Sequence, residues 1–333
     1  MSTIKNQVNL MAVVFEVVVR LVIKDSMANN PNHQSLCRRR RRQSREQKSI
    51  NQQQQHEQKH RQQQPKYYEF DQMPEYLRFN QWIHSGYRSP QLSTIECLKS
   101  CFELHNETMN IWTHLLSILY ILYNFRTIFI TKFYNSKLIY FHIISCLSSW
   151  FGSLLYHIFM NHRLGRKIYY PLLKIDMFGI WITQTFGALT TIQASLIMFD
   201  ESFRLYFSVI YLAISMVVLY ECLQAKESWQ RSTSFSILFL MRLICFMIRL
   251  RTHYNPNQMS LLLKIFKYRH IIGQEIWPII GAIIASTKIP ERFFNNGQFD
   301  YFLNSHNIMH CLVVMGGLHM HWSFIDDIQF FIN

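Results

Sequence analysis

The chain has 333 residues, of which 49% are hydrophobic and only 16% charged, and its formal net charge is +14. With 10 glycines and 8 prolines it is too apolar for an ordinary soluble domain, and it is predicted to be a membrane protein with a polar tail. The 7 cysteines are scattered and contain no Cys-x-x-Cys pair, so neither a disulfide framework nor a thiolate metal site is predicted.

The first 66 residues are predicted to form a disordered, basic tail, because residues 26–66 are rich in Gln, Asn, Arg and His and poor in apolar side chains. A short apolar segment at residues 8–23 is interrupted by Glu16 and Arg20, so we interpret it as an interfacial helix or a spurious chain start. A basic block beside a membrane domain is typical of a cytosolic tail near anionic lipid, and nucleic-acid binding is not expected. Residues 67–109 are then a cytosolic segment ahead of the first span.

Downstream, apolar runs long enough to cross a bilayer alternate with polar breaks. They predict an all-α membrane protein, with a bundle of seven transmembrane helices in residues 110–333. Because the tail is expected to be cytosolic, the odd number of spans puts the C-terminus outside or in a lumen, and the choice between plasma membrane and endomembrane stays open. The runs cover residues 110–130, 138–160, 175–198, 204–221, 233–250, 271–288 and 306–325.

Polar side chains collect at one predicted membrane depth, on the side of the tail. His306 and His310 are four residues apart at the start of the seventh run, so they share a helix face and can ligate one divalent ion. Span parity puts Ser153 and His157, near the end of the second run, and Asp176, near the start of the third, at the same level. The pattern predicts a Zn²⁺ site held by His157, His306 and His310, with Asp176 holding or deprotonating a water at the open position. Ser153 by itself is also typical of helix packing.

The other histidines of the predicted spans and loops are not assigned as ligands of this ion. His319 and His321 lie about 13–17 Å beyond His310 along a helix axis, so they cannot share its ion. His114 is interpreted as a packing histidine rather than a fourth ligand. His162, about one turn past His157, is the substitute ligand should one assignment be wrong.

Two opposite charges also stand inside predicted spans. Arg242 lies in the fifth run and Glu275 in the sixth. Because an unpaired charge at the centre of a span costs about 2.5–3.5 kcal/mol even on insertion scales, we expect these two side chains to pair with each other.

The polar residues singled out above stand within short motifs of specific spacing. The chain reads Glu107-Thr108-Met109-Asn110-Ile111-Trp112-Thr113-His114-Leu115, close to E-T-x-N-I-W-T-H-L. Ser153–His157 matches S-x-x-x-H, Ile175–Ile180 is close to L-D-x-x-G-I, Ile289–Phe294 contains P-E-R-F-F, and Ser305–His310 matches S-H-x-x-x-H. With these motifs, residues 74–326 resemble the progestin and adiponectin receptor (PAQR) family, within the hemolysin-III-related superfamily.

The resemblance implies seven helices with a cytosolic N-terminus and an intramembrane zinc held at His157, His306 and His310. It further implies that Asp176 contacts the zinc-bound water and that Ser153 orients the water or stabilises an oxyanion. Members of the family include receptors for adiponectin-like proteins, steroids or plant defence proteins, and several are associated with ceramidase-type amide hydrolysis. Arg242 and Glu275 depart from the family pattern.

The leading functional hypothesis is a zinc-dependent, ceramidase-like hydrolase of a lipid amide, coupled or not to receptor signalling in lipid metabolism. Its expected partners are membrane lipids of the ceramide class and an extracellular protein or steroid ligand, and the oligomeric state stays open. The rival hypothesis is a non-catalytic receptor or scaffold in which zinc only ties helices together. A zinc or proton pathway across the bundle is a third alternative.

Overall fold

The computed structural model describes residues 66–125, 137–252, 266–294 and 296–328. The chain divides into two units, residues 1–64 and 65–333, and every described element belongs to the second. The predicted disordered tail, up to residue 65, and its apolar segment at residues 8–23 lie outside the described residues.

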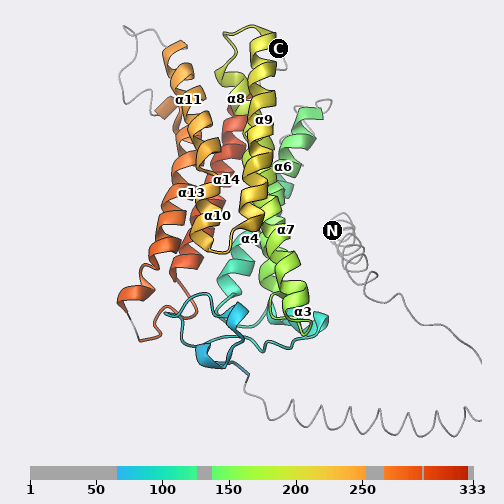
Figure 1. Cartoon of the computed structure of the whole chain (residues 1–333), viewed down its shortest axis with the longest axis vertical. Coiled ribbons are helices and arrows are strands. Elements are labelled where there is room, and N and C mark those ends of the chain that lie inside the picture. The colour runs from blue at the N-terminus through green and yellow to red at the C-terminus, as the bar shows by residue number, and fades with distance from the viewer. Residues whose placement is uncertain (1–65, 126–136, 253–265, 295, 329–333) are drawn as a thin grey trace, which may run out of the picture. The chain divides into compact units, whose positions relative to one another are not determined.

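The described part of the second unit is helical, which confirms the all-α prediction. Long helices run alongside one another through the bundle (Figure 1). They are α4 (Thr108–Asn124), α6 (Lys137–Phe159), α7 (Arg166–Ile182), α9 (Glu201–Gln224), α11 (Ser236–Thr252), α13 (Arg269–Thr287) and α14 (Ser305–Asp327). Shorter elements are η1 (Phe70–Gln72), η2 (Glu75–Leu77), α3 (Thr94–Ser100), η4 (Thr183–Gly187), α8 (Leu189–Ser195), α10 (Ser228–Ser234) and η5 (Glu291–Phe293).

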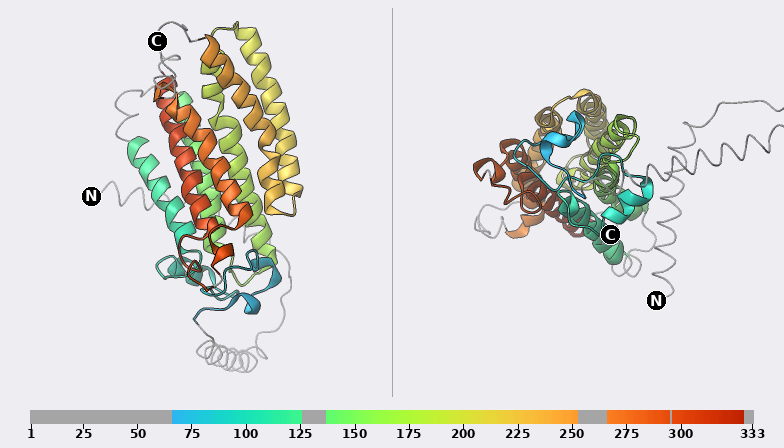
Figure 2. Two further views of the ribbon diagram at one scale, coloured as in Figure 1. Left: turned by 90° about the vertical axis from the view of Figure 1, so that its left-hand side faces the viewer. Right: turned by 90° about the horizontal axis from the view of Figure 1, so that it is seen from below.

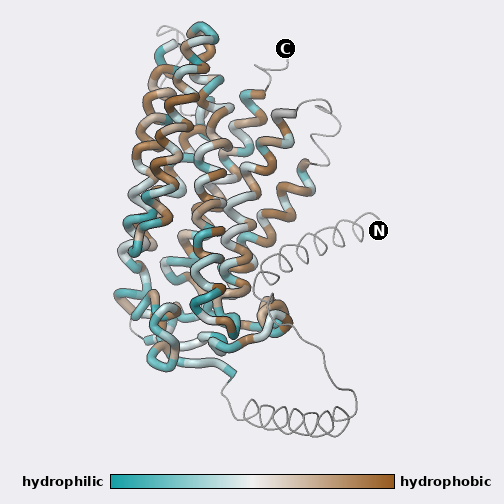
Figure 3. Tube along the Cα trace, turned by 45° about the vertical axis from the view of Figure 1, so that its right-hand side comes forward, coloured by the Kyte–Doolittle hydropathy of each residue, from teal (hydrophilic) through white to brown (hydrophobic). Residues whose placement is uncertain are grey.

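Four stretches of helix within the described residues are long and apolar enough to cross a bilayer. They are Ile139–Phe159, Glu201–Gln224, Trp229–Thr252 and Ser305–Asp327. Apolar residues predominate along these helices, while the loops and short helices at one end of the bundle are more polar (Figure 3). This distribution is what burial of the helices in lipid requires, because polar backbone loops are tolerated only outside the hydrocarbon layer.

The third predicted span differs most from the structure. Its expected start was residue 175, but α7 begins at Arg166, directly after Gly165, whose φ of 56° interrupts the helix on that side. Hydropathy placed the boundary too late because the first turns of α7 carry Arg166, Lys167 and Lys174, and a helix does not end where its apolar run ends. Asp176 therefore lies almost three turns inside α7 rather than at its start. Beyond Ile182 the chain continues through the π-helical turn η4 into α8.

Small residues allow α6 and α7 to approach closely. A Cβ atom added at Gly152 would lie 2.8 Å from the carbonyl oxygen of Ile175 and 3.0 Å from the Cα of Asp176. One added at Gly179 would lie 3.1 Å from the Cα of Ser149. Any side chain at Gly152 or Gly179 would push the two backbones apart, so these glycines place Asp176 against the helix that carries Ser153 and His157.

Residues 66–107, here called the cap segment, lie across one end of the bundle (Figure 2). The buried guanidinium of Arg88 donates hydrogen bonds to the carbonyl oxygens of His157, at 2.6 Å, and Ile158, at 3.1 Å. These are carbonyls of the last turn of α6, where no helical donor remains and a cation is favoured by the helix dipole. The cap segment therefore fixes the end of α6 that carries His157.

Two carboxylates join the cap segment to the chain that leads into α14. Glu291 accepts hydrogen bonds from Asn80 Nδ2, at 2.9 Å, and from the backbone N–H of Ser305, at 2.7 Å. Asp300 accepts from the backbone N–H of Ser85 at 2.9 Å and from its hydroxyl at 2.7 Å. The first turn of α14, which carries His306, is thereby held at the same end of the bundle.

Candidate metal centre

Three histidines from two helices meet at the end of the bundle that the cap segment closes. His157 lies in the last turn of α6, and His306 and His310 lie in the first two turns of α14. Each offers one ring nitrogen, and the three ligand atoms all lie within 4.8 Å of one another. His306 Nε2 and His310 Nε2 are 3.2 Å apart. Two nitrogens bound about 2.0–2.1 Å from a tetrahedral ion are separated by about 3.3 Å, so this group could hold a metal ion.

Asp176 and Ser153 lie on α7 and α6, two helices whose backbones approach closely. Asp176 is buried in α7 and close enough to His157 to interact with it electrostatically. Its Oδ1 atom is buried and has no hydrogen-bond partner among the described residues. Ser153 is buried on α6, one turn before His157. Since a buried carboxylate oxygen without a donor is costly, a water held at the three histidines would give Asp176 the partner it lacks.

Glu107, for which the sequence suggested no role, contacts one of the three histidines. Its Oε2 lies 2.7 Å from His157 Nδ1, and both side chains are buried. A carboxylate only accepts, so Nδ1 carries the proton and the lone pair of Nε2 is left for a metal. Burial lowers the pKa of the neighbouring His105 to about 3, so the neutral ring accepts, through Nδ1, the backbone N–H of Glu107 at 3.0 Å.

His114 also takes a place that the sequence did not suggest. Its Nε2 lies 2.5 Å from His310 Nδ1, across the contact between α4 and α14. With the proton of this hydrogen bond on His310 Nδ1, the Nε2 lone pair of His310 is left for a metal. His114 does not belong to the group of three, in line with its interpretation as a packing histidine, but the residue it packs against is His310. His162, considered as a substitute ligand, lies outside the group, and its Nε2 instead lies 3.2 Å from Thr94 Oγ1.

A signal for Glu107 was present in the sequence, since it is the first residue of the motif that ends with His114 and Leu115. Its partner His157 stands 50 residues further along the chain. Only the packing of α4 against α6 shows which histidine it contacts.

Comparison with known proteins identifies the family of the chain. Residues 102–322 match the family model described as haemolysin-III related. The chain belongs to the haemolysin-III-related family. It is similar to progestin and adipoQ receptor family member 4 of Homo sapiens, with 32% identity over 79% of this chain and 94% of the relative. It is also similar to the ADIPOR-like receptor IZH2 of Saccharomyces cerevisiae, with 30% identity over 75% of this chain and 80% of the relative. The membrane progestin receptor gamma of Homo sapiens is 24% identical over 75% of this chain and 78% of the relative.

Family membership and the four apolar helices together make the chain a multi-pass integral membrane protein. The resemblance noted from the short motifs is thus confirmed over most of the chain.

Within this haemolysin-III-related chain, replacing Glu107 with glutamine is expected to weaken metal binding by about 10–100-fold. The neutral amide cannot match the carboxylate in holding the Nδ1 proton of His157 and in raising the basicity of its Nε2. Metal affinity would be measured on purified protein by competition with a chelator. Glu103→Gln is the matched control, because that side chain is 46% exposed and contacts only Lys66, at 3.6 Å, among the ion pairs of the described residues. If the Glu107 variant and the unmodified chain bound the metal with equal affinity, Glu107 would have no part in metal binding.

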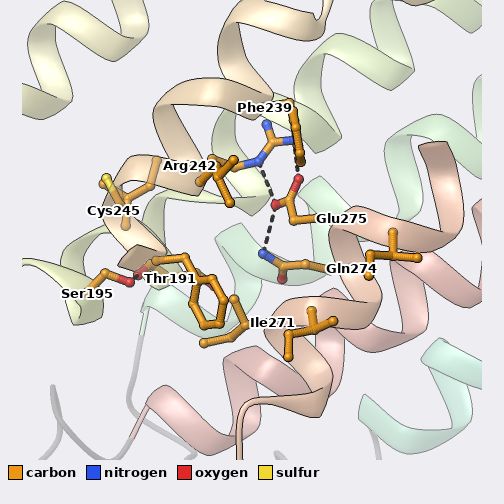
Figure 4. Close-up of a pocket in the computed structure, with 13 residues that line it drawn as sticks. Thr191, Ser195, Phe239, Arg242, Cys245, Ile271, Gln274 and Glu275 are labelled. Carbon is orange, nitrogen blue, oxygen red and sulfur yellow. Dashed lines mark hydrogen bonds and ion pairs between the residues drawn. The ribbon is translucent and has the colours of Figure 1, made fainter. Parts of the chain in front are cut away.

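A second polar group lies between α11 and α13, where the expected pair of Arg242 and Glu275 is confirmed. Arg242 Nε lies 2.7 Å from Glu275 Oε1 and Nη2 lies 2.8 Å from Oε2, a two-pronged contact. Nη1 of Arg242 also lies 3.2 Å from the hydroxyl of Tyr211. The pair stands at the wall of a mainly apolar pocket of about 150 Å³, beside Gln274 (Figure 4).

Proposed function

We propose that this chain is a zinc-dependent hydrolase of a lipid amide, of the ceramide class, acting at the three-histidine group. The observation that carries the proposal is the buried Oδ1 of Asp176, which has no protein partner among the described residues and stands beside histidines whose second nitrogens are already engaged. A set of three neutral imidazoles with a nearby carboxylate is typical of catalytic zinc, whereas structural sites close with four protein ligands.

The chain's own residues would divide the chemistry as follows. Zinc, when bound, supplies Lewis-acid activation of a water and of the amide carbonyl. The Asp176 carboxylate accepts the proton of the attacking water and returns it to the leaving amine. The Ser153 hydroxyl donates a hydrogen bond to the carbonyl oxygen as negative charge develops there. Glu107 and His114 hold the rings of His157 and His310 in the orientation that the site requires.

We further propose a membrane topology of seven spans. Four of the spans would be the apolar stretches given above. The other three would be α4, α7 continued through η4 and α8, and α13. Residues 110–333 would then be the membrane domain, and the cap segment would lie in the cytosol because it directly follows the basic tail, which the positive-inside rule favours on that side. The C-terminus would lie outside or in a lumen, and the basic tail would be cytosolic.

A second candidate function is a receptor in which the metal only stabilises the bundle. Two observations favour it: the three histidines join α6 to α14, and relatives carry the names progestin receptor and adipoQ receptor. In that case a steroid or an extracellular protein would be the ligand and metal binding would contribute to folding alone.

Metal removal separates the two candidates. Purified full-length protein in lipid nanodiscs is expected to contain equimolar zinc and to release fatty acid from a short-chain ceramide. Treatment with a chelator should abolish the release, and added zinc should restore it, because the water then lacks its activating ion. Zinc content with no hydrolysis of any lipid amide would favour the receptor.

The site assignment is tested in the same preparation with His306→Ala combined with His310→Ala. Loss of both ligands is expected to remove the zinc. The matched control is His270→Ala with His319→Ala, another pair of histidines in contact across two helices, with Nδ1 atoms 3.1 Å apart. If the His306 and His310 variant kept equimolar zinc, the metal centre would have to lie elsewhere.

A further inference from the structure

We propose that His142, Cys146 and His321 form a second metal site, distinct from the three-histidine centre, which binds monovalent copper. The sequence predicted no thiolate site because the cysteines are scattered. The tertiary structure changes this conclusion, since it brings two histidines from different helices to one cysteine.

The three ligand atoms converge on one point. His142 and Cys146 are one turn apart on α6, and His321 is contributed by α14. His142 Nε2 lies 3.3 Å from His321 Nδ1 and 3.2 Å from Cys146 Sγ, and the three ligand atoms lie within 4.8 Å of one another. Each of the three residues is only 1% exposed. Nitrogens about 2.0 Å from a shared ion are about 3.3–3.5 Å apart, so small shifts would complete the site.

This cluster cannot share an ion with the three-histidine centre. His142 precedes His157 by 15 residues on α6, and His321 follows His310 by 11 residues on α14. At about 1.5 Å per residue the two sites are separated by about 16–22 Å along the helix axes. The two helices are therefore joined by metal-ligating side chains at two separate levels.

Ordinary core packing explains the cluster less well than a metal does. The ring of His142 stacks on Phe324, with centroids 3.8 Å apart and planes 4° apart, which fixes the orientation of the ring and of its Nε2. Both Cys146 Sγ and His321 Nδ1 approach Nε2 of His142, at 3.2 Å and 3.3 Å, and Sγ also lies 3.9 Å from Nδ1 of the same ring. A neutral imidazole nitrogen has one proton or one in-plane lone pair, so a hydrogen bond accounts for one of these contacts and a single ion accounts for both.

The choice of metal follows from charge and ligand type. A thiolate with two imidazoles is a soft donor set, which favours monovalent copper or zinc over harder ions. Binding releases the thiol proton to water and forms the sulfur–metal bond, without any change of oxidation state. The complex with Cu⁺ is then neutral, whereas the complex with Zn²⁺ keeps one positive charge among apolar helices, which is costly. Three protein ligands also suit copper better than structural zinc, which takes four.

The test uses purified full-length protein under anaerobic conditions, with cuprous ion buffered by bicinchoninate as the probe. The unmodified chain is expected to withdraw copper from the chelator and to show a copper–sulfur distance by X-ray absorption. Cys146→Ser should weaken copper binding by about 100-fold or more, because losing a metal ligand lowers affinity more than losing a residue that only hydrogen-bonds to a ligand. The same change should abolish the copper–sulfur signal.

Two controls separate the site from misfolding and from the other centre. Cys245→Ser, at another buried cysteine, should bind copper as the unmodified chain does. The Cys146 variant should keep the zinc of the three-histidine centre, and the His306 and His310 variant should keep its copper. Unchanged copper affinity in Cys146→Ser would overturn the proposal. It would also be overturned if the unmodified chain bound a second zinc ion and only Cys146→Ser removed that ion, because the site would then be a zinc site.

Discussion

Replacing Asp176 with asparagine is expected to lower the rate of lipid-amide hydrolysis by about 10²–10⁴-fold, the usual contribution of a general base. The side chain is buried, its Oδ1 has no partner among the described residues, and it stands beside the histidine group. Asparagine has nearly the same shape but cannot accept a proton from water. Zinc content and thermal stability should stay at the level of the unmodified chain, because the three histidines are unaltered. The measurement is turnover of a short-chain ceramide, with zinc determined in the same sample.

The matched control is Asp200→Asn, at the start of α9. Asp200 accepts a hydrogen bond from the backbone N–H of Phe203 at 3.1 Å, and asparagine serves equally well as a helix N-cap. Full activity in the Asp176 variant, with zinc retained, would mean that another group takes the proton or that the reaction needs no base.

Replacing Arg242 with leucine is expected to destabilise the protein by about 3–5 kcal/mol, because it leaves Glu275 buried without its counter-ion. The side chains of the pair are only 9% and 15% exposed, so water does not replace the lost partner. Glu275→Leu should destabilise to a similar extent, and the two changes together should be much less harmful than either alone, because no buried charge remains. Thermal unfolding in detergent and the yield of folded protein measure the effect.

Arg251→Leu is the control for this series, since Arg251 lies on the same helix and is exposed. Exchange of the two charges, Arg242→Glu with Glu275→Arg, should restore part of the loss, because the attraction does not depend on which helix carries the cation. An Arg242→Leu protein as stable as the unmodified chain would show that the pair contributes nothing to the fold.

The prediction of the fold succeeded where lipid burial dictates composition and was weaker at helix ends. The second, fourth and seventh apolar runs coincide closely with α6, α9 and α14. The start of α7 was misplaced because hydropathy reports the apolar part of a helix, while the hydrogen-bonded helix continues through Lys174 back to Arg166. The fifth run, residues 233–250, begins in the last two residues of α10 and covers most of α11, and the two helices meet at Phe235.

For the candidate sites, the sequence could indicate what lies on one helix face. The spacing of His306 and His310 puts them one turn apart in any helix, and span parity then put His157, Ser153 and Asp176 at the same depth. It also showed that Arg242 and Glu275 need counter-ions, since charges inside an apolar run are costly wherever the helix packs. Which side chains come into contact across two helices depends on the rotation of each helix about its axis and on the axial shift between the two helices. Local sequence patterns carry no information on either quantity.

The sequence alone therefore determined that this chain is helical, apolar and membrane-bound, and that two histidines, His306 and His310, share one face at the start of its seventh apolar run. The tertiary structure alone decided that Glu107 and His114 contact the rings of His157 and His310, and that His142 and Cys146 of α6 meet His321 of α14. The physical reason is the same in each case: residues one turn apart are neighbours by helix geometry, whereas residues on different helices become neighbours only when side-chain packing sets the registry of the helices.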